Sequence, residues 1–154
     1  MTRRGYLLVA LAGSVLSLAG AFFFQYVMAI LPCHLCILQR WPHAVMVAVA
    51  AVALFLPKTV FMLAGALAAV VSTALAIYHS GVERKLWAGP SDCTGGQDLS
   101  GLTGADLLST DITIGVVQCD EISYSILGLS FANYNILLSL GLVVIWGLAA
   151  RSRA

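Results

Sequence analysis

The chain has 154 residues, of which 60% are hydrophobic and 10% charged, with a net charge of +1. Soluble domains carry about 25% charged residues, so this composition, with a mean hydropathy of +0.95, excludes an ordinary soluble core. The near-zero net charge also gives no basis for nucleic-acid binding. By its length the chain is expected to form a single domain, residues 1–154.

Long uncharged intervals predict four membrane-spanning helices. The charge-free intervals lie between Arg4 and Arg40, Arg40 and Lys58, Lys58 and Glu83, and Glu121 and Arg151. Apolar intervals of about 18 residues or more are long enough to cross a bilayer as helices. We expect spans at residues 6–24, 41–56, 59–79 and 133–150. The N-terminal stretch also resembles a secretory signal, but its apolar run continues to Leu31, which favours an uncleaved span.

The basic residues indicate how these spans are oriented. With four spans, five of the eight basic residues fall on one side, namely Arg3, Arg4, Lys58, Arg151 and Arg153. The positive-inside rule then places both termini in the cytoplasm. Loops 25–40 and 80–132, which hold the four cysteines, then face outward. In a bacterium that side is the oxidising periplasm, where disulfides persist. The expected fold is an all-α membrane protein, a four-helix bundle with a long, partly ordered periplasmic loop between helices 3 and 4.

A Cys-x-x-Cys pair, Cys33 and Cys36, follows the first span, and Arg40 comes four residues later. A cation near a thiol favours the thiolate. If this stretch is helical, the 100° step per residue places both cysteines, Arg40 and His43 on a common face. Pro42 cannot donate a backbone N–H and so leaves open whether the cysteines lie in a helix or in a turn.

The loop at residues 80–132 is the most polar part of the chain. It carries seven acidic and two basic residues and contains Cys93 and Cys119. Its apolar segment 122–131 is too short to span and is expected to lie on the membrane surface. His79, at the end of the third span, is expected at about the depth of Arg40, as a solvated cap or a functional residue.

Four cysteines admit three disulfide connectivities. The competing interpretations are thiol–disulfide chemistry, an inert structural disulfide, and a zinc site formed by the four cysteines or by the Cys-x-x-Cys pair with His34 or His43. An outward-facing membrane site favours redox chemistry. Acidic neighbours disfavour thiolates at Cys93 and Cys119, so electrons are expected to flow from that pair to the Cys-x-x-Cys pair. A membrane quinone would suit as acceptor, because Arg40 can stabilise a developing oxyanion. Arg40 could instead be an interfacial residue that reaches out of the bilayer.

These features together resemble the DsbB family of disulfide bond formation proteins. The residues that carry the resemblance are Pro32-Cys33-x-Leu35-Cys36-x-x-x-Arg40, the pair Cys93 and Cys119, Glu121, and the run Leu127-Gly128-Leu129 before the last span. The resemblance covers nearly the whole chain. It implies an inner-membrane enzyme that reoxidises a periplasmic, thioredoxin-fold DsbA-like oxidase and passes the electrons to ubiquinone or menaquinone.

The resemblance also implies a role for each site residue. Cys93 would form a mixed disulfide with the client, and its partner Cys119 would exchange with Cys33. Cys36 would be the thiolate that faces the quinone, Arg40 would hold the quinone, and His79 resembles the family's quinone-side histidine. No resident metal is expected. The alternatives are a quinone reductase of the vitamin K epoxide reductase type, which places its Cys-x-x-Cys late in the chain, and a membrane scaffold with structural disulfides.

Overall fold

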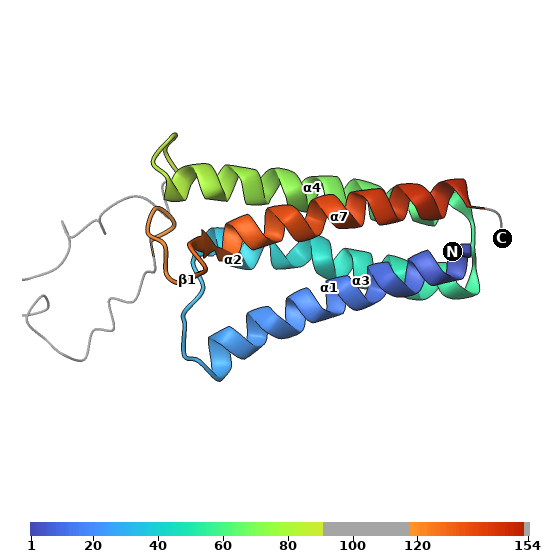
Figure 1. Ribbon diagram of the computed structural model, residues 1–154, viewed down its shortest axis with the longest axis horizontal. Coiled ribbons are helices and arrows are strands. Elements are labelled where there is room, and N and C mark those ends of the chain that lie inside the picture. The colour runs from blue at the N-terminus through green and yellow to red at the C-terminus, as the bar shows by residue number, and fades with distance from the viewer. Residues whose placement is uncertain (91–117, 153–154) are drawn as a thin grey trace, which may run out of the picture.

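The computed structural model describes residues 1–90 and 118–152. Within these residues, four long helices lie side by side along the length of the molecule (Figure 1). They are α1 (Arg3–Tyr26), α3 (Arg40–Phe55), α4 (Thr59–Glu83) and α7 (Phe131–Arg151). A short helix, α2 (His34–Leu38), precedes α3, and two short strands, β1 (Ser125–Ile126) and β2 (Leu129–Ser130), precede α7.

Four segments are long and apolar enough to cross a membrane, α2 and α3 together forming one of them, with mean hydropathies of 1.5 to 2.3. The predicted all-α, four-span bundle is therefore confirmed. The helices extend past the predicted spans, since α1 begins at Arg3, α4 continues to Glu83 and α7 begins at Phe131. The predicted spans stop near charges, but helical hydrogen bonding continues through the interface, where long charged side chains can reach water.

Local sequence explains where several elements begin and turn. Thr2 caps α1 by accepting a hydrogen bond from the backbone N–H of Gly5, and Ser130 caps α7 in the same way. The strands β1 and β2 pair antiparallel. Their two-residue turn has positive φ angles of 51° at Leu127 and 78° at Gly128, as primed hairpin turns require. The apolar segment 122–131 thus contains a hairpin that leads into α7.

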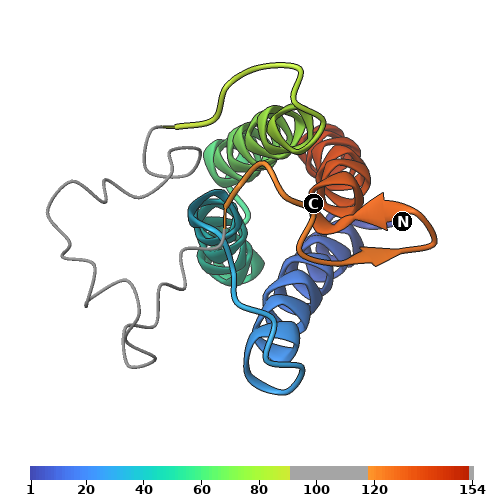
Figure 2. The same cartoon turned by 90° about the vertical axis from the view of Figure 1, so that its left-hand side faces the viewer.

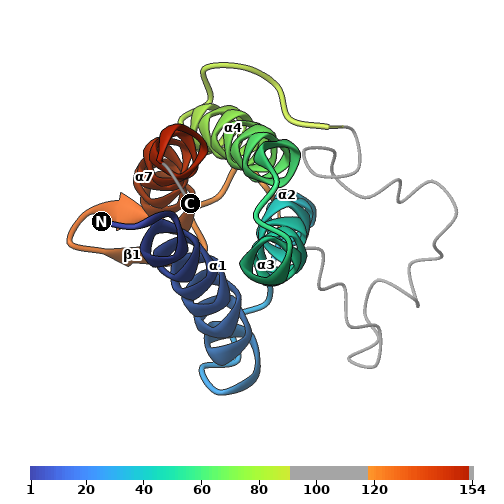
Figure 3. The same cartoon turned by 90° about the vertical axis from the view of Figure 1, so that its right-hand side faces the viewer.

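The four long helices pack in a ring in which α1 and α4 each contact both α3 and α7. Figures 2 and 3 show this ring from its two ends. Both termini and the α3–α4 turn lie at one end, called here the terminal end (Figure 1). The short helix α2 and the hairpin lie at the opposite end, where α1 diverges from the other helices. This end is called here the dithiol end, because α2 carries Cys36 and is preceded by Cys33.

The terminal end holds the main apolar core, built from Leu7, Met46, Met62, Leu142, Trp146 and several alanines. Gly65 is essential to it, because a Cβ there would lie 2.4 Å from the Trp146 ring. Small residues of this kind allow close helix packing in membranes. Arg3 joins three chain segments at this end by donating to the backbone carbonyls of Pro57 and Ser152.

The outward faces of the helices are apolar and exposed. Leu8 is 49% exposed, Leu67 64% and Leu137 61%. In a soluble protein such surface would promote association, whereas a bilayer is apolar throughout its core. The exposed side chains therefore agree with helices that face lipid.

Candidate redox site

Cys33 and Cys36 lie at the start of α2. Cys33 is the N-cap residue, and its sulfur accepts the backbone N–H of Cys36 at 3.2 Å. The two sulfur atoms are 2.8 Å apart, and both residues are thiols in the structure. Cys33 is only 3% exposed. The capping geometry thus brings the two sulfurs together, within reach of a disulfide bond.

The question of helix or turn is answered by a short helix followed by a break. Pro42 lies in the first turn of α3 and has no N–H to give the carbonyl of Leu38, where α2 ends. Gln39, between the two helices, keeps helical angles of φ −67° and ψ −17°. Residues on either side of the break therefore keep the rotation about the axis that a continuous helix would give them. Cys36, Arg40 and His43 line one cavity, as expected from their spacing. Cys33 was predicted on the same face, but it is the N-cap residue of α2 with an extended backbone and does not line this cavity.

That cavity has a volume of about 380 Å³ and lies at the dithiol end. Its walls are mainly apolar and include Leu16, Gly20, Phe24, Phe131 and Leu138, together with a few polar groups. Phe24 packs against Phe131, with ring centroids 4.7 Å apart. Small-molecule sites have this character, with apolar walls and a small number of placed polar groups.

Arg40 is held at the cavity by residues of α1. One guanidinium nitrogen, Nη1, donates to Gln25 Oε1 at 2.6 Å, and the guanidinium carbon lies 5.1 Å from the Phe22 ring centroid. Its Nε is buried and has no hydrogen-bond partner among the described residues. Arg40 therefore retains a donor beyond those used in holding its side chain.

His79 of α4 lies beside Cys33 and, like Cys36, lines the cavity. It is 2% exposed, and its Nε2 lies 3.5 Å from Cys33 Sγ. Its Nδ1 lies 2.7 Å from Gln39 Nε2. Glu83, one turn further along α4, lies 3.8 Å from His79 Nε2. His79 is thus a buried residue that joins the dithiol to the cavity wall, rather than a solvated cap.

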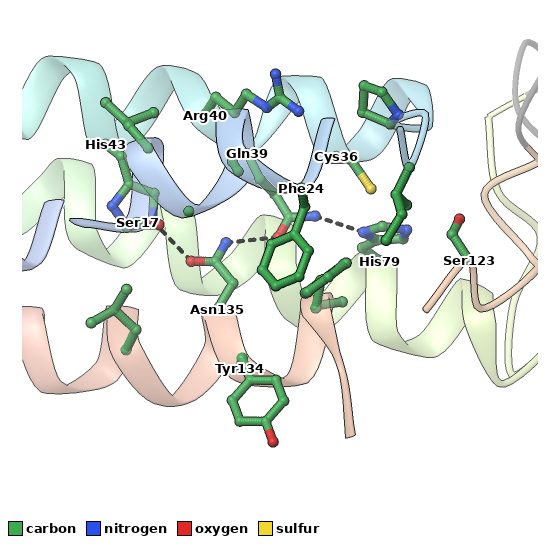
Figure 4. Close-up of a pocket in the computed structure, with 18 of the residues that line it drawn as sticks. Ser17, Phe24, Cys36, Gln39, Arg40, His43, His79, Ser123, Tyr134 and Asn135 are labelled. Atoms are coloured by element: carbon green, nitrogen blue, oxygen red, sulfur yellow. Dashed lines mark hydrogen bonds between the residues drawn. The ribbon is translucent and has the colours of Figure 1, made fainter. Parts of the chain in front are cut away.

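A row of polar side chains continues along the cavity wall, as Figure 4 shows. Asn135 of α7 donates to Gln39 Oε1 at 2.7 Å, and its own oxygen lies 2.9 Å from His43 Nε2. Neither Gln39 nor Asn135 was predicted as a site residue from the sequence. Their signal is polarity inside segments that otherwise read as membrane spans.

Cys119 packs into the same buried cluster as Cys33, Leu35 and Val82. It is fully buried and disulfide-bonded. A sulfur of the polar loop is thereby brought to the dithiol, although the two lie far apart in sequence. Cys93, the other predicted loop cysteine, lies outside the described residues.

The thiol of Cys33 is disfavoured as a thiolate. Its hydrogen bond to the Cys36 sulfur and, second, its burial raise the pKa of Cys33 above the usual range. Cys33 therefore retains its proton at neutral pH. Of the two sulfurs, the one that lines the cavity, Cys36, is the acceptor of the hydrogen bond between them.

The same residues bear on the zinc alternative. Donor atoms of Cys33, Cys36 and His79 lie within 4.8 Å of one another. Two thiolates on one tetrahedral zinc are about 3.7 Å apart, given Zn–S bonds of about 2.3 Å, whereas these sulfurs are 2.8 Å apart. The geometry is closer to that of a dithiol about to form a disulfide than to a preformed zinc site.

Comparisons with known proteins address the family. The family model described as "Disulfide bond formation protein DsbB" matches residues 3–149. A protein of Rickettsia prowazekii, "Uncharacterized protein RP370", is 27% identical over 144 residues, covering 92% of this chain and 84% of the relative. "Disulfide bond formation protein B" of Polaromonas sp. is 29% identical over 141 residues, covering 89% and 83%.

No solved structure matches the chain significantly. The family match covers nearly all of the sequence and agrees with the four spans and with the dithiol at one end of the bundle. The resemblance drawn from the sequence is thus confirmed, and the chain belongs to the DsbB family of disulfide-forming membrane oxidoreductases.

Proposed function

We propose that this protein is a thiol:quinone oxidoreductase that reoxidises a DsbA-like periplasmic oxidase with ubiquinone or menaquinone as electron acceptor. The observation that carries the proposal is the shared cavity, in which Cys36 of the dithiol lies with the cation of Arg40. A nucleophilic sulfur and a hydrogen-bond donor thus face one apolar volume at the dithiol end.

The residues of the cavity fit a quinone. Its volume of about 380 Å³ lies within the range of about 300–1,000 Å³ found for small-molecule sites. Its apolar walls suit a lipid-soluble ring, and the buried Nε of Arg40 can donate to an oxygen there. A bound quinone would supply the electron acceptor, taking up two electrons and two protons to become a quinol.

The chain's own cysteines would carry the electrons in a series of four thiol–disulfide exchanges. A client thiolate attacks Cys93, forming a mixed disulfide, and Cys119 leaves as a thiolate. Cys119 then attacks Cys33 of the oxidised dithiol, and Cys36 leaves as a thiolate facing the cavity. The second client thiol attacks the client sulfur of the mixed disulfide, which forms the client disulfide and releases Cys93 as a thiolate. Cys93 then attacks Cys119 in the Cys119–Cys33 disulfide, so the loop disulfide re-forms and Cys33 and Cys36 are both left reduced. Two client thiols have become one disulfide, and their two electrons and two protons are on the dithiol that adjoins the cavity. The burial of Cys119 beside Cys33 supports the second step.

Each remaining site residue has a role in this scheme. Arg40 would orient the quinone ring and stabilise negative charge that develops on its oxygen. His79 contacts both Cys33 and the cavity, so it would act at the sulfur as well as at the quinone side. The hydrogen bond that Arg40 donates to Gln25 keeps the Arg40 side chain against α1.

The charge distribution supports a location in the bacterial inner membrane, with both termini in the cytoplasm and the cysteines in the periplasm. Arg3 and Arg151 lie in the helices that meet at the terminal end, and Lys58 lies in the turn between α3 and α4. The dithiol is at the opposite end of the same helices. The positive-inside rule assigns the end rich in Lys and Arg to the cytoplasm.

Stopped-flow oxidation of a reduced DsbA-like protein by the purified chain in lipid nanodiscs tests the proposal. With ubiquinone or menaquinone present we expect repeated turnover, and Cys36→Ser should abolish it. A scaffold held by structural disulfides would show no turnover in either form. Failure of the unsubstituted protein with both quinones would refute the proposed activity.

A further inference from the structure

Four polar side chains form a chain of hydrogen bonds along the cavity wall in one direction. His43 Nε2 lies 2.9 Å from Asn135 Oδ1, Asn135 Nδ2 donates to Gln39 Oε1 at 2.7 Å, and Gln39 Nε2 lies 2.7 Å from His79 Nδ1. Figure 4 shows these side chains between α3, α7 and α4. Each amide donates with its nitrogen on one side and accepts with its oxygen on the other.

A backbone carbonyl sets this direction. The Gln39 amide nitrogen also lies 3.3 Å from the carbonyl oxygen of Leu35. A carbonyl can only accept a hydrogen bond, so the Gln39 atom beside it must be the nitrogen. That nitrogen also faces His79 Nδ1, which must therefore accept. A neutral imidazole that accepts at Nδ1 carries its proton on Nε2.

The Nε2 atom that carries this proton lies nearer to the dithiol than to the carboxylate of Glu83, whose oxygen is 3.8 Å away. His79 Nε2 is 3.5 Å from Cys33 Sγ, and the Cys33 thiol donates to Cys36 Sγ at 2.8 Å. Every donor from His43 onward thus points the same way, and the last acceptor is the sulfur that lines the cavity. Hydrogen bonds aligned in this manner polarise one another in a low-dielectric interior.

We propose that Gln39 and Asn135 are positioning residues that hold His79 in its Nε2–H tautomer and so keep a hydrogen-bond donor on the Cys33–Cys36 dithiol. The assignment of Cys36 as the quinone-facing sulfur rests on the proposed function, but the hydrogen-bond chain does not. The positions of both residues suit this role. Gln39 is only 7% exposed, so water competes little for its hydrogen bonds, and Asn135 of α7 connects Gln39 to His43. Neither needs to touch a substrate, because each acts through His79.

Alkylation of the reduced dithiol in nanodiscs tests this inference without client or quinone. Iodoacetamide labelling of the Cys33–Cys36 peptide would be followed by mass spectrometry across a pH series. Gln39→Leu should slow the first labelling about tenfold at neutral pH, which corresponds to a shift of about one pH unit in the profile. Asn135→Leu should change the profile in the same direction, because it removes the hydrogen bond to the Gln39 oxygen and leaves the amide held only at its nitrogen.

Two controls separate positioning from packing. Asn133 also lies on α7 and accepts a hydrogen bond, from Ser80 at 2.7 Å, but it does not line the cavity. Asn133→Leu should leave the labelling profile unchanged. In a His79→Ala background, Gln39→Leu should have no further effect, since its influence passes through the imidazole.

Nitrogen NMR of the His79 ring provides a second measurement, and an unprotonated Nδ1 is expected. Normal labelling of Gln39→Leu, an equal slowing in the His79→Ala background, or a proton on Nδ1 would each overturn the inference. Because labelling needs no electron acceptor, an enzyme inactive with quinones could still show the shift. An active enzyme without the shift would refute only the positioning role.

Discussion

The two ends of the bundle are packed by different means. At the terminal end, Trp146 fits against Gly65, alanines bring the helices close, and Arg3 joins three segments. At the dithiol end, α1 diverges and leaves a cavity of about 380 Å³ with hydrogen-bonded polar groups in its wall. The comparison suggests that close packing at one end stabilises the helices, which lets the other end keep an open volume. Four substitutions test this division.

The largest effect is expected at the dithiol end, from Arg40→Met. The substitution preserves much of the side chain's length but removes the charged donor. A charge-assisted hydrogen bond contributes about 1.5–3 kcal/mol, so kcat/KM for quinone should fall about 100-fold while the melting temperature changes little. Steady-state kinetics at varied quinone concentration would measure this. Arg84, exposed at the end of α4, provides the control, and an equal loss in Arg84→Met would contradict a specific role.

A stability effect of somewhat smaller size is expected at the terminal end. In Gly65→Val the new side chain meets the Trp146 ring, because even a Cβ would lie 2.4 Å from it. Overpacking of this kind costs about 1–3 kcal/mol. Thermal unfolding followed by tryptophan fluorescence should show a lower midpoint. Among the described residues, no other part of the chain lies within 4 Å of the Cβ position of Gly147 on α7, so Gly147→Val should be milder. Equal melting temperatures for Gly65→Val and Gly147→Val would show that the close contact between Gly65 and Trp146 is unimportant.

A third substitution fills the cavity without disturbing the core. Gly20 lines the cavity, and in the part of the chain that the structure describes no other segment lies within 4 Å of a Cβ there. Gly20→Leu should therefore raise KM for quinone about tenfold by occupying the site, while stability holds or rises, since Leu forms helices better than Gly by about 1 kcal/mol. Gly20→Ala should have an intermediate effect. Unchanged KM in both variants would mean that the quinone binds elsewhere.

The smallest effect concerns the protonation of Cys33. The Cys36 hydrogen bond and burial raise the pKa of Cys33, so at pH 8 less of it is thiolate than in an ordinary cysteine. Removing the bond in Cys36→Ala should lower this pKa, and Cys33 should then be alkylated at lower pH than in the unsubstituted protein. Labelling rates across pH 6–10 would measure the difference. Faster labelling of Cys33 in the unsubstituted protein would contradict the assignment.

The sequence predicted the bundle well because charge is so unevenly distributed along it. Gaps between charged residues located all four spans, although they understated the helices at Arg3 and Glu83. Helical spacing also predicted a common face for both cysteines, Arg40 and His43. Cys36, Arg40 and His43 line the cavity, whereas Cys33 precedes the helix as its N-cap and does not. These were local patterns, which a single segment can reveal.

The rest of the site depends on contacts between distant segments. Gln39 meets His79 across 40 positions and Asn135 across 96, and no local pattern records such pairs. The hairpin before α7 was also not predicted, because its strands are only two residues each. Its signal was Gly128, which adopts a positive φ of 78°. The predicted acidic surroundings of Cys93 lie outside the described residues.

The backbone of Gln39 has a consequence for how the site tolerates changes in chain length. Gln39 keeps helical backbone angles where α2 ends and α3 begins. The chain can therefore bend at Gln39 while successive residues still turn by the helical step about the axis. An inserted residue would turn α2 by about 100° relative to α3. Cys36 would then leave the face that holds Arg40 and His43, even with every side chain retained. The spacing between Cys36 and Arg40 is therefore a structural requirement as strict as the identity of either residue.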